Sequence, residues 1–390
     1  MLKVALNRHR ILMLKNKIYK YLSNEILKNF ITILLTFTAI AWTVRAVNFL
    51  DLMIEDGYSA TIYFKYSLLN ISTIISRFIP LSFLLSLIIS IVKFERQQEL
   101  LILWTTGLNK IKIVNIFFLI SIVITLFQII LSLFVNPYSL NKSRSLLRDT
   151  NISQINSILK TNDFSDSFKG VTFYIDKKKK NGDLENIFIK DSNGSINTIV
   201  NEVNKSSNST IIAKKGFTTN NKLVLFNGYI QTLNEKKEIK NVNFEKTELS
   251  LNNFSTRTIK QPKLQETSTY NLMKCYKSKK DEGLQNCSYK NKKKEVVETL
   301  SRRMGMPLYI PLISIIASFM LIYKKEKKYN YLKKYIIFAF AFIILLSAEI
   351  VLKFTGFSNI NFVLYFVAPL FLFITLYALL IKNMTLEKRI

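Results

Sequence analysis

The sequence has few of the residue types that carry catalysis or bind metals. Its 390 residues include 1 histidine and 2 cysteines. His9 stands alone in a basic leader, so neither a histidine-based metal site nor a Ser-His-Asp triad can be assembled. No Gly-x-x-x-x-Gly-Lys-Ser/Thr loop occurs, which excludes ATP binding by that route. We therefore expect a protein that is not an enzyme and that itself binds no metal or cofactor.

Acidic residues are also scarce, with 26 Asp and Glu against 55 Lys and Arg and a net charge of +29. In a soluble protein this excess would suggest a nucleic-acid partner. The apolar residues, however, are concentrated before about residue 136 and after about residue 304, with a polar block between them. This pattern indicates a membrane protein with one soluble domain. Basic cytoplasmic loops, or a basic domain that faces an anionic ligand or membrane surface, then explain the charge, and we expect no nucleic acid.

Six apolar runs approach the roughly 20 residues that a membrane-spanning helix needs. They cover about residues 30–50, 60–92, 111–135, 304–323, 335–352 and 362–381. The first run lacks a small-residue cleavage site and is too long for a signal-peptide core, so we interpret it as an uncleaved helix. Pro80 should kink the second run. The short basic loops at 93–112 and 324–334 and the basic C-terminus fall on the N-terminal side, which predicts a multi-pass protein with both termini in the cytoplasm.

The polar block, residues 136–303, would then lie outside the cytoplasm. Short alternating segments at 170–176, 184–190, 211–213, 222–226, 228–232 and 242–244, with Asn-Gly and Gly-Asp turn signals, predict strands. We favour an antiparallel sandwich or jelly roll, with a barrel as the alternative. The predicted fold class is a polytopic α-helical membrane protein with six transmembrane helices and an extracytoplasmic antiparallel β-jelly-roll domain. Its regions are 1–135 with helices one to three, 136–303 with the β domain and a linker, and 304–390 with helices four to six.

Residues 262–300 are rich in lysine and serine and should form a loop and a helical lead into the fourth membrane helix. They contain both cysteines, Cys275 and Cys287. Outside the cytoplasm two thiols in one short segment could form a disulfide. They could equally be unpaired, and the sequence leaves both alternatives open.

The break between the second and third apolar runs, Lys93 to Lys112, is amphipathic at helical period. One face holds Leu100, Leu103, Trp104 and Leu108, and the opposite face holds Glu95, Gln98, Glu99 and Thr105. Gly107 with Asn109 is typical of a helix end. A helix of about a dozen residues would lie at the cytoplasmic surface and present Glu95 and Glu99 outward. It is either a plain interfacial connector or a coupling helix held by a soluble partner.

Ionisable residues also occur within or near the apolar runs, where they usually face a bundle interior or water. Arg45 and Glu349 lie near helix ends, from which they could extend to the interface, whereas Arg77 lies deeper. Four arginines could bind the phosphates of an anionic lipid: Arg45, Arg77, Arg302 and Arg303. The energy cost of leaving either Arg77 or Glu349 unpaired motivates the hypothesis of an ion pair between them.

The whole layout resembles the LptF/LptG permease family of lipopolysaccharide exporters. The stretches that carry the resemblance are Ala39–Met53, Ile79–Leu85, Glu99–Leu108, Gly170–Asp191 and Arg302–Pro307. The most specific is Glu99–Leu108, which is similar to the family's coupling segment, although Leu103 stands where methionine is common. The first-helix end and the outer strands favour the LptF side over the LptG side.

The resemblance implies an inner-membrane permease subunit of an ABC transporter that extracts lipopolysaccharide and passes it to a periplasmic bridge for outer-membrane assembly. The implied partners are an LptG-like permease, an LptB-like ATPase dimer, which would bind ATP and Mg²⁺, and an LptC-like periplasmic protein. The coupling helix, about residues 94–108, would dock on the ATPase through Glu95, Glu99, Leu103, Trp104 and Gly107, with Glu99 pairing a basic residue.

The implied jelly roll could shelter acyl chains in its interior. Its predicted interior side chains, which ordinary core packing would explain equally, are Phe173, Ile175, Ile187, Ile189, Leu223 and Leu225. The competing function is a membrane scaffold or sensor that does not transport and whose outer domain binds a ligand.

Overall fold

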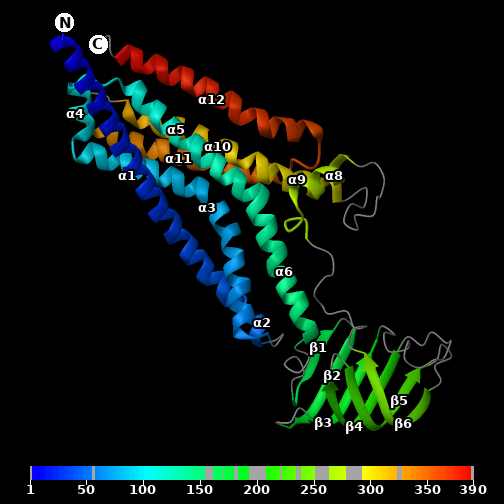
Figure 1. Cartoon of the computed structure of the whole chain (residues 1–390). Coiled ribbons are helices and arrows are strands. Elements are labelled where there is room, and N and C mark those ends of the chain that lie inside the picture. The colour runs from blue at the N-terminus through cyan, green and yellow to red at the C-terminus, as the bar shows by residue number, and fades with distance from the viewer. Residues whose placement is uncertain are drawn as a thin grey trace. The chain divides into compact units, whose positions relative to one another are not determined.

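The computed structural model describes residues 2–54, 58–153, 161–168, 170–179, 183–192, 208–219, 222–233, 239–250, 263–277, 292–322 and 327–387. These residues divide into two compact units (Figure 1). The helical unit consists of Met1–Val44, Asn70–Asn141 and Lys263–Ile390. The β unit consists of Arg45–Leu69 and Lys142–Pro262.

The described helices range from 4 residues in α2 to 47 residues in α1. Their bounds are α1 Leu2–Asn48, α2 Asp51–Ile54, α3 Ala60–Arg96, α4 Glu99–Thr105, α5 Lys110–Ile130, α6 Asn136–Ser153, α8 Thr269–Lys277, α9 Lys292–Met304, α10 Tyr309–Ser318, α11 Lys327–Leu352 and α12 Asn359–Glu387. A π-helix, Leu131–Val135, joins α5 to α6, and 3₁₀ turns at Met306–Leu308 and Phe319–Leu321 flank α10.

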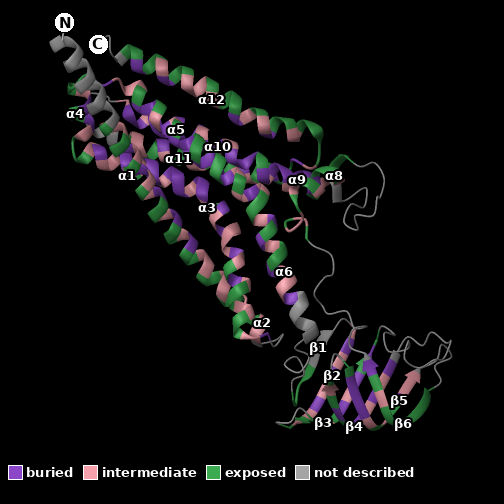
Figure 2. Ribbon diagram, viewed as in Figure 1, coloured by how far each residue is buried: buried purple, intermediate pink, exposed green. Residues whose placement is uncertain are grey.

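Six stretches of the described helices are long and apolar enough to cross a membrane, which confirms the predicted multi-pass architecture. They are Lys17–Met53, Ala60–Arg96, Lys110–Leu147, Lys294–Leu321, Leu332–Leu352 and Asn359–Leu386. The fourth is the most enclosed, with 78% of its apolar window buried, against 17% for the sixth. Figure 2 shows the same contrast between α10 and α12. The helical core is therefore built around α10, and α12 exposes most of its surface.

The sequence predicted that the third apolar run ends at Asn136-Pro137, but the helix continues past these two residues. The chain continues from α5 through the π-helix into α6 without a break in helical structure. Pro137 is the second residue of α6. Because Pro137 has no N–H, the carbonyl of Leu133 lacks its usual helical donor, and the Thr269 hydroxyl donates to it at 2.8 Å. The π-helix marks the place where the sequence indicated an end.

The β unit contains one six-stranded antiparallel sheet, which confirms the predicted antiparallel β domain. Its strands are β1 Phe164–Phe168, β2 Val171–Lys178, β3 Asp183–Asp191, β4 Asn208–Thr219, β5 Lys222–Leu233 and β6 Ile239–Ser250. They lie in the sheet in chain order, so the described strands connect as a meander rather than by the long crossings of a jelly roll. Sequence reasoning missed β1 and divided β5 into two strands at Asn227, whose φ is 50°, just before Gly228.

Gly228 does not interrupt β5 because its neighbours use the space where a side chain would stand. It pairs with Ala213 on one side and Phe244 on the other. A Cβ at Gly228 would lie 2.7 Å from Cζ of Phe244 and 2.2 Å from the carbonyl oxygen of Ile212. The aromatic ring of β6 therefore covers a glycine in the neighbouring strand, which continues the sheet across that position.

One face of the sheet is buried and mainly apolar, as strand alternation requires, with Asp191 and Ser209 as buried polar residues beside Val171. All six side chains predicted for the interior lie on this face, and each is at most 2% exposed: Phe173, Ile175, Ile187, Ile189, Leu223 and Leu225. They pack with Val171, Leu184, Ile211 and Leu249 in one cluster. The sequence therefore identified the core face of the β unit correctly.

The segment after residue 263 packs with the helices, although we placed it in the outer domain on sequence grounds. Lys263–Ile390 belongs to the helical unit. Leu272 of α8 and Val296 and Leu300 of α9 form a small buried cluster that joins the two helices. The helical lead into the fourth span is confirmed, but its packing moves the domain boundary from 303 to 262.

Candidate functional site

The predicted coupling segment contains a shorter helix than the expected 94–108. The second span extends to Arg96, and Gln98 then adopts a left-handed conformation with φ 57° before α4 begins at Glu99. Gly107, with φ +79°, follows α4, and Asn109 caps α5 by accepting from the backbone nitrogen of Ile111 at 3.2 Å. The two turns give a seven-residue helix with a defined start and stop. The predicted helix end at Gly107 and Asn109 is confirmed.

The acidic side chains of this segment, which the sequence predicted to face outward, are partly exposed and contact neighbouring helices at the surface. The Tyr21 hydroxyl of α1 donates to Oε1 of Glu99 at 2.9 Å. Nζ of Lys334 on α11 lies 2.6 Å from Oε2 of Glu95. Because α4 is short and starts from a left-handed turn, its first residue lies against α1.

A second ion pair links α1 to α3. Lys93 binds Glu25 one turn from Tyr21, and the Glu25 side chain is largely buried. Asn29 of α1 continues the row by donating to the hydroxyl of Ser90 at 2.8 Å. These pairs and the Glu95–Lys334 contact hold the end of α3 against α1 and α11, and the Glu99 contact holds α4, which follows α3, against α1.

The outward face of α4 is apolar. Leu101 and Ile102 are 59% and 58% exposed, whereas Leu100 and Leu103 are each 8% exposed and pack into the helical core. Trp104 is half-buried, and Nζ of Lys110 lies 5.2 Å from its ring centroid. Leu103 and Trp104, predicted as coupling residues, thus hold α4 to its own chain. The surface available to a partner is formed by Leu101 and Ile102.

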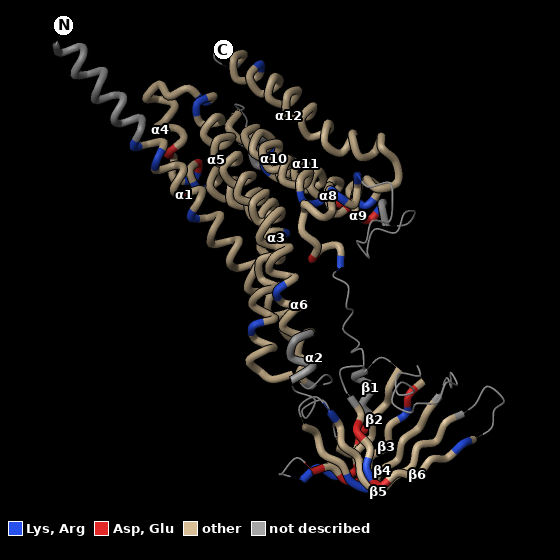
Figure 3. Tube along the Cα trace, turned by 45° about the vertical axis from the view of Figure 1, so that its right-hand side comes forward, with Lys and Arg blue, Asp and Glu red and all other residues tan. Residues whose placement is uncertain are grey.

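α4 lies at the end of the helical unit where α1 begins and α12 ends (Figure 1). Figure 3 shows acidic and basic positions together beside it. This arrangement is the one expected if the first and last helices and the α3–α5 connection share one side of a membrane. Polar contacts therefore surround an exposed apolar helix face at one end of the bundle.

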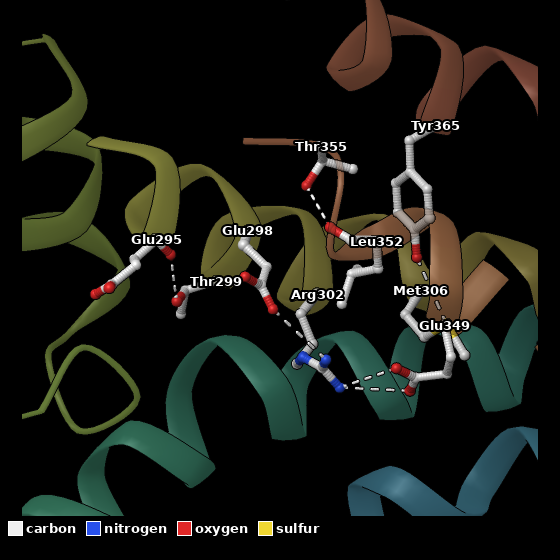
Figure 4. A network of polar contacts seen from close by, with 9 residues as sticks. All are labelled: Glu295, Glu298, Thr299, Arg302, Met306, Glu349, Leu352, Thr355 and Tyr365. Atoms are coloured by element: carbon white, nitrogen blue, oxygen red, sulfur yellow. Dashed lines mark hydrogen bonds and ion pairs between the residues drawn. The ribbon is translucent and has the colours of Figure 1, made fainter. Parts of the chain in front are cut away.

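A second group of functional candidates lies near the junction of α9 and α10. Nη1 of Arg302 donates to both carboxylate oxygens of Glu349 on α11, at 3.2 and 3.4 Å (Figure 4). Glu298, one turn earlier on α9, lies 4.0 Å from Nη2 of Arg302. Glu349, which was predicted to pair with Arg77, thus pairs with Arg302, because α9 and α11 bring Arg302 and Glu349 together. The hypothesis of an Arg77–Glu349 pair is wrong.

Arg303 has a structural role in place of the predicted lipid contact. Its side chain is almost fully buried, and Nη2 donates to the carbonyl oxygens of Leu264, Gln265 and Thr267 at 3.3, 3.0 and 2.9 Å. Nη1 donates to the Thr269 hydroxyl at 2.8 Å. A guanidinium group offers five N–H donors in a fixed geometry, and these contacts hold the segment before α8 against α9.

Arg77, Arg302 and Arg303 line one cavity of about 90 Å³. Its wall comes from α3, α5, the π-helix, α6, α9 and α11, and it also includes Ser76, Gln128, Ser132, Asn136 and Glu349. Three of the four arginines predicted to bind lipid therefore lie at one cavity, and their binding of lipid stays a prediction. Arg45, the fourth predicted lipid-binding arginine, belongs to the β unit, where it is half-buried near the end of α1.

The described residues include only one of the two cysteines of the predicted disulfide. Cys275 of α8 takes part in a disulfide bond. Cys287, the only other cysteine of the chain, lies outside the described residues. The pairing of Cys275 with Cys287 stays a prediction.

Sequence reasoning missed three residues that build these sites. Tyr21 and Lys334 lie far along the chain from α4, and no local pattern indicated their contacts. Gln128 gave a readable signal, since it is one of two amides, with Asn115, in the apolar run 111–135 and lies among Phe, Leu and Ile. A polar side chain within a membrane span indicates a bundle interior or a functional site.

Two comparisons with known proteins found similar sequences. The chain is similar to the uncharacterized protein RP871 of Rickettsia prowazekii (strain Madrid E), with 24% identity over 173 residues. That match covers 44% of this chain and 48% of the relative, so the chain spans about half the length of the curated relative it matches. The family described as lipopolysaccharide export system permease LptF/LptG matches residues 20–383. Because this match extends from α1 to α12 and includes both candidate sites, the chain belongs to the LptF/LptG family of lipopolysaccharide export permeases.

Proposed function

We propose that this chain is a permease subunit of an ABC transporter that takes lipopolysaccharide from the inner membrane and delivers it to a periplasmic bridge. The observation that carries the proposal is the exposed pair Leu101 and Ile102 on α4, a helix that Glu99 ties to α1 and that follows α3, which Glu95 ties to α11. A rigidly held apolar face is suited to transmit the movement of a bound partner to the helices that clamp it.

The partner at α4 would be a separate ATPase dimer of the LptB kind, which binds ATP and Mg²⁺. Leu101 and Ile102 would enter an apolar groove, and Glu99 would exchange its Tyr21 contact for a basic residue of that groove. Burial of two aliphatic side chains would stabilise the complex by about 3 kcal/mol or more. Glu99 would fix the position of α4 in the groove, because a charged pair at an interface fixes the relative position of its partners.

The other parts of the proposal follow from the assignment as a permease subunit. The chain would be the LptF-side subunit beside an LptG-like permease, with both termini in the cytoplasm and the β unit in the periplasm against an LptC-like protein. The buried apolar face of the sheet would open to receive acyl chains. Arg45, Arg77 and Arg302 would attract the phosphates of the glycolipid.

The test is co-purification of the tagged full chain in mild detergent with its candidate ATPase, followed by mass spectrometry of the bound proteins and lipids. We expect Leu101→Asp with Ile102→Asp to weaken ATPase binding about tenfold or more, because both charges would have to be desolvated. Leu386→Asp is the matched control, since Leu386 is an exposed leucine of α12, whose C-terminal end lies on the same side of the helical unit.

Recovery of an ATPase and an acylated phosphoglycolipid with the wild-type chain and with Leu386→Asp, but of no ATPase with the double variant, would support the exporter. Recovery of the wild-type chain alone under crosslinking would overturn it. That result would favour the alternative, a membrane scaffold or sensor whose β unit binds a ligand. An LptG-side assignment would follow if the co-purifying six-helix partner matched the LptF side better than this chain does.

A further inference from the structure

One face of the nine-residue helix α8 is packed against the helical unit. Leu272 is 1% exposed, and it forms a buried cluster with Val296 and Leu300 of α9. Cys275, one turn later on the same face, also packs against this cluster. With a rise of about 1.5 Å per residue, α8 is about 13 Å long, which is too short to cross a membrane. It is therefore held beside the bundle as a separate short helix.

The start of α8 is fixed where the apolar parts of two spans end. The Thr269 hydroxyl donates to the carbonyl oxygen of Leu133 and accepts from Nη1 of Arg303, both at 2.8 Å. Leu133 lies close to Val135, the last residue of the third apolar run. Arg303 lies directly before Met304, where the fourth apolar run begins. Both contacts therefore place the start of α8 at a boundary of the membrane rather than at its centre.

The exposed side of α8 carries a row of large apolar side chains. Tyr270, Met273 and Tyr276 recur at every third residue, so they lie along one ridge of the helix. Their exposed fractions are 77%, 39% and 39%. Two lysines of the same helix, Lys274 and Lys277, are also exposed. Because residues four apart are neighbours on a helix surface, Lys274 lies beside Tyr270 and Lys277 lies beside Met273.

This combination of side chains is typical of a helix that lies at a membrane surface. Interfacial helices bury an apolar face at the boundary between headgroups and acyl chains, and they carry lysines on the polar face. Tyrosine is enriched at this boundary because its ring is apolar and its hydroxyl is polar. Lysine can extend its ammonium group to the headgroups while its methylene chain stays in the apolar zone. The exposed side of α8 therefore fits the interfacial zone of a bilayer better than it fits water.

The connection between α11 and α12 has a similar composition and contacts α9. It joins the fifth and sixth candidate spans, so it lies at a membrane boundary. Phe354 and Phe357 in this connection are 51% and 62% exposed. Nζ of Lys294, in the first turn of α9, lies 3.2 Å from the ring centroid of Phe357. α8, α9 and this connection lie together at the end of the helical unit opposite α4 (Figure 1), so their exposed aromatic residues share one boundary.

We propose that α8 is an interfacial helix whose row Tyr270, Met273 and Tyr276 inserts into the phospholipid bilayer at this boundary, with Lys274 and Lys277 among the headgroups. The partner is the bulk bilayer and not a transported lipid, so the proposal requires only the six candidate spans and not the export reaction. The anchored helix would hold at the membrane surface the segment that follows the β unit in the chain and leads into the fourth span.

The test measures which phase surrounds α8 in the full chain, reconstituted in vesicles of equal parts phosphatidylcholine and phosphatidylglycerol. Tyr270→Trp introduces a fluorescent reporter at an exposed position, and the signal of the parent chain, from Trp42 and Trp104, is subtracted. Phosphatidylcholine brominated near the start of its acyl chains quenches from the membrane, and acrylamide, which is uncharged, quenches from the water. Ile343→Trp, at a 60% exposed position of the fifth span, is the membrane reference. Tyr229→Trp, at a 37% exposed position of β5, is the water reference.

We expect the brominated lipid to quench Tyr270→Trp about as strongly as Ile343→Trp, and acrylamide to quench it about twofold less, or weaker still, than Tyr229→Trp. Acrylamide quenching equal to that of Tyr229→Trp, without quenching by the brominated lipid, would place α8 in water and overturn the proposal. Protection from both quenchers would also overturn it, because a second copy of the chain would then cover the row.

The two lysines are tested in the chain that carries Tyr270→Trp. Lys274→Glu with Lys277→Glu should reduce the lipid quenching about twofold, because anionic phosphatidylglycerol repels the new carboxylates. Lys214→Glu with Lys215→Glu, an equal change of charge at two exposed lysines of β4, is the matched control and should leave the quenching unchanged. Equal lipid quenching in the two lysine variants would overturn the placement of Lys274 and Lys277 among the headgroups.

Discussion

Arg302 of α9 and Glu349 of α11 form an ion pair with 3.2 Å between Nη1 and Oε2. Each belongs to a membrane-spanning segment, Arg302 to the fourth and Glu349 to the fifth. An ionised group in a span usually pairs with another inside the bundle, and this pair joins two spans that are adjacent in the chain. The side chains keep 35% and 45% of their exposure, so the pair is neither fully buried nor free in solvent.

Glu349→Gln should lower the stability of the helical unit. Arg302 would retain only Glu298, whose carboxylate lies 4.0 Å away. Partly exposed ion pairs contribute about 1 kcal/mol or less, so the expected loss is of that order. Thermal unfolding in detergent measures it. The exchange Arg302→Glu with Glu349→Arg should recover more than half of the loss, and recovery by an Arg77–Glu349 exchange instead would show that the observed pair is not the one that stabilises the protein.

Tyr21→Phe should loosen α4 without unfolding the bundle. The substitution removes the hydroxyl that donates to Glu99 at 2.9 Å and leaves the ring packing against Phe94. A hydrogen bond to a charged acceptor contributes about 1.5–3 kcal/mol, and less where water can replace it, as at this surface. Hydrogen–deuterium exchange of the Glu99–Thr105 amides should therefore become faster.

Tyr19→Phe is the control for that experiment. Tyr19 lies on the same helix, and its buried hydroxyl has no partner among the described residues. Its loss should leave the exchange of the α4 amides unchanged. If both variants exchanged alike, the Tyr21–Glu99 contact would not be what holds α4 in place.

Gly305→Ala should destabilise the junction between α9 and α10. A Cβ at Gly305 would lie 2.5 Å from Cε1 of Tyr365 and 2.9 Å from the carbonyl oxygen of Ser301. Tyr365 is fully buried, and its hydroxyl lies 3.5 Å from Sδ of Met306 (Figure 4), so its ring has little room to move. Overpacking of this kind costs about 1–3 kcal/mol.

The readout for Gly305→Ala is the midpoint of thermal unfolding in detergent. Ser301→Ala, one turn earlier on the same helix, should be nearly neutral because its buried hydroxyl has no partner among the described residues. An unchanged midpoint for Gly305→Ala would mean that Tyr365 can leave its observed position at no measurable cost.

The stability of the sheet should depend on pH through two carboxylates. The hydrogen bond from Lys179, 2.7 Å away, lowers the pKa of Glu185, and the hydrogen bond from Lys222 at 3.2 Å lowers the pKa of Glu248. Each folded-state pKa is below the ordinary value of 4.5. At a pH between the folded-state pKa and 4.5, the unfolded chain therefore binds more protons than the folded chain does. The stabilisation is therefore complete above about pH 4.5 and is lost as the pH falls through the folded-state pKa.

Hydrogen–deuterium exchange of β3 and β6 between pH 3 and pH 6, corrected for intrinsic rates, measures this effect. Glu185→Gln and Glu248→Gln should each flatten the pH dependence of protection. Glu245→Gln is the comparison, since Glu245 lies on β6 and has no ion pair among the described residues. A profile equally steep in all three variants would exclude these two pairs as its cause.

The sequence was sufficient for features that depend on periodicity and length. Six apolar runs predicted six spans, and alternation placed Phe173, Ile175 and their neighbours on the buried face of the sheet. The strand boundaries were less accurate, because β4 and β6 contain polar positions whose place in the sheet depends on pairing with a neighbour rather than on hydrophobicity.

The sequence indicated which residues the sites need, but not which residues contact each other there. The sequence indicated that Arg77, Arg302 and Glu349 need partners, yet the choice of partner follows from how α9 and α11 pack. Likewise, amphipathic periodicity identified the α4 segment, but it assigned the outward side to Glu95 and Glu99. Their contacts to Lys334 and Tyr21 span many residues of sequence, and no local rule contains them.

The π-helix between α5 and α6 has a consequence for sequence length. An α-helix turns about 100° per residue, so the one extra residue held in a π-helical turn rotates everything after it by that angle. Removal of one residue from Leu131–Val135 would restore regular winding and turn Asn136 about a quarter of a circle away from the cavity that it now lines. The identity of the residues in that turn therefore matters less than their number, and a family member with one residue fewer there would present a different side chain at this place.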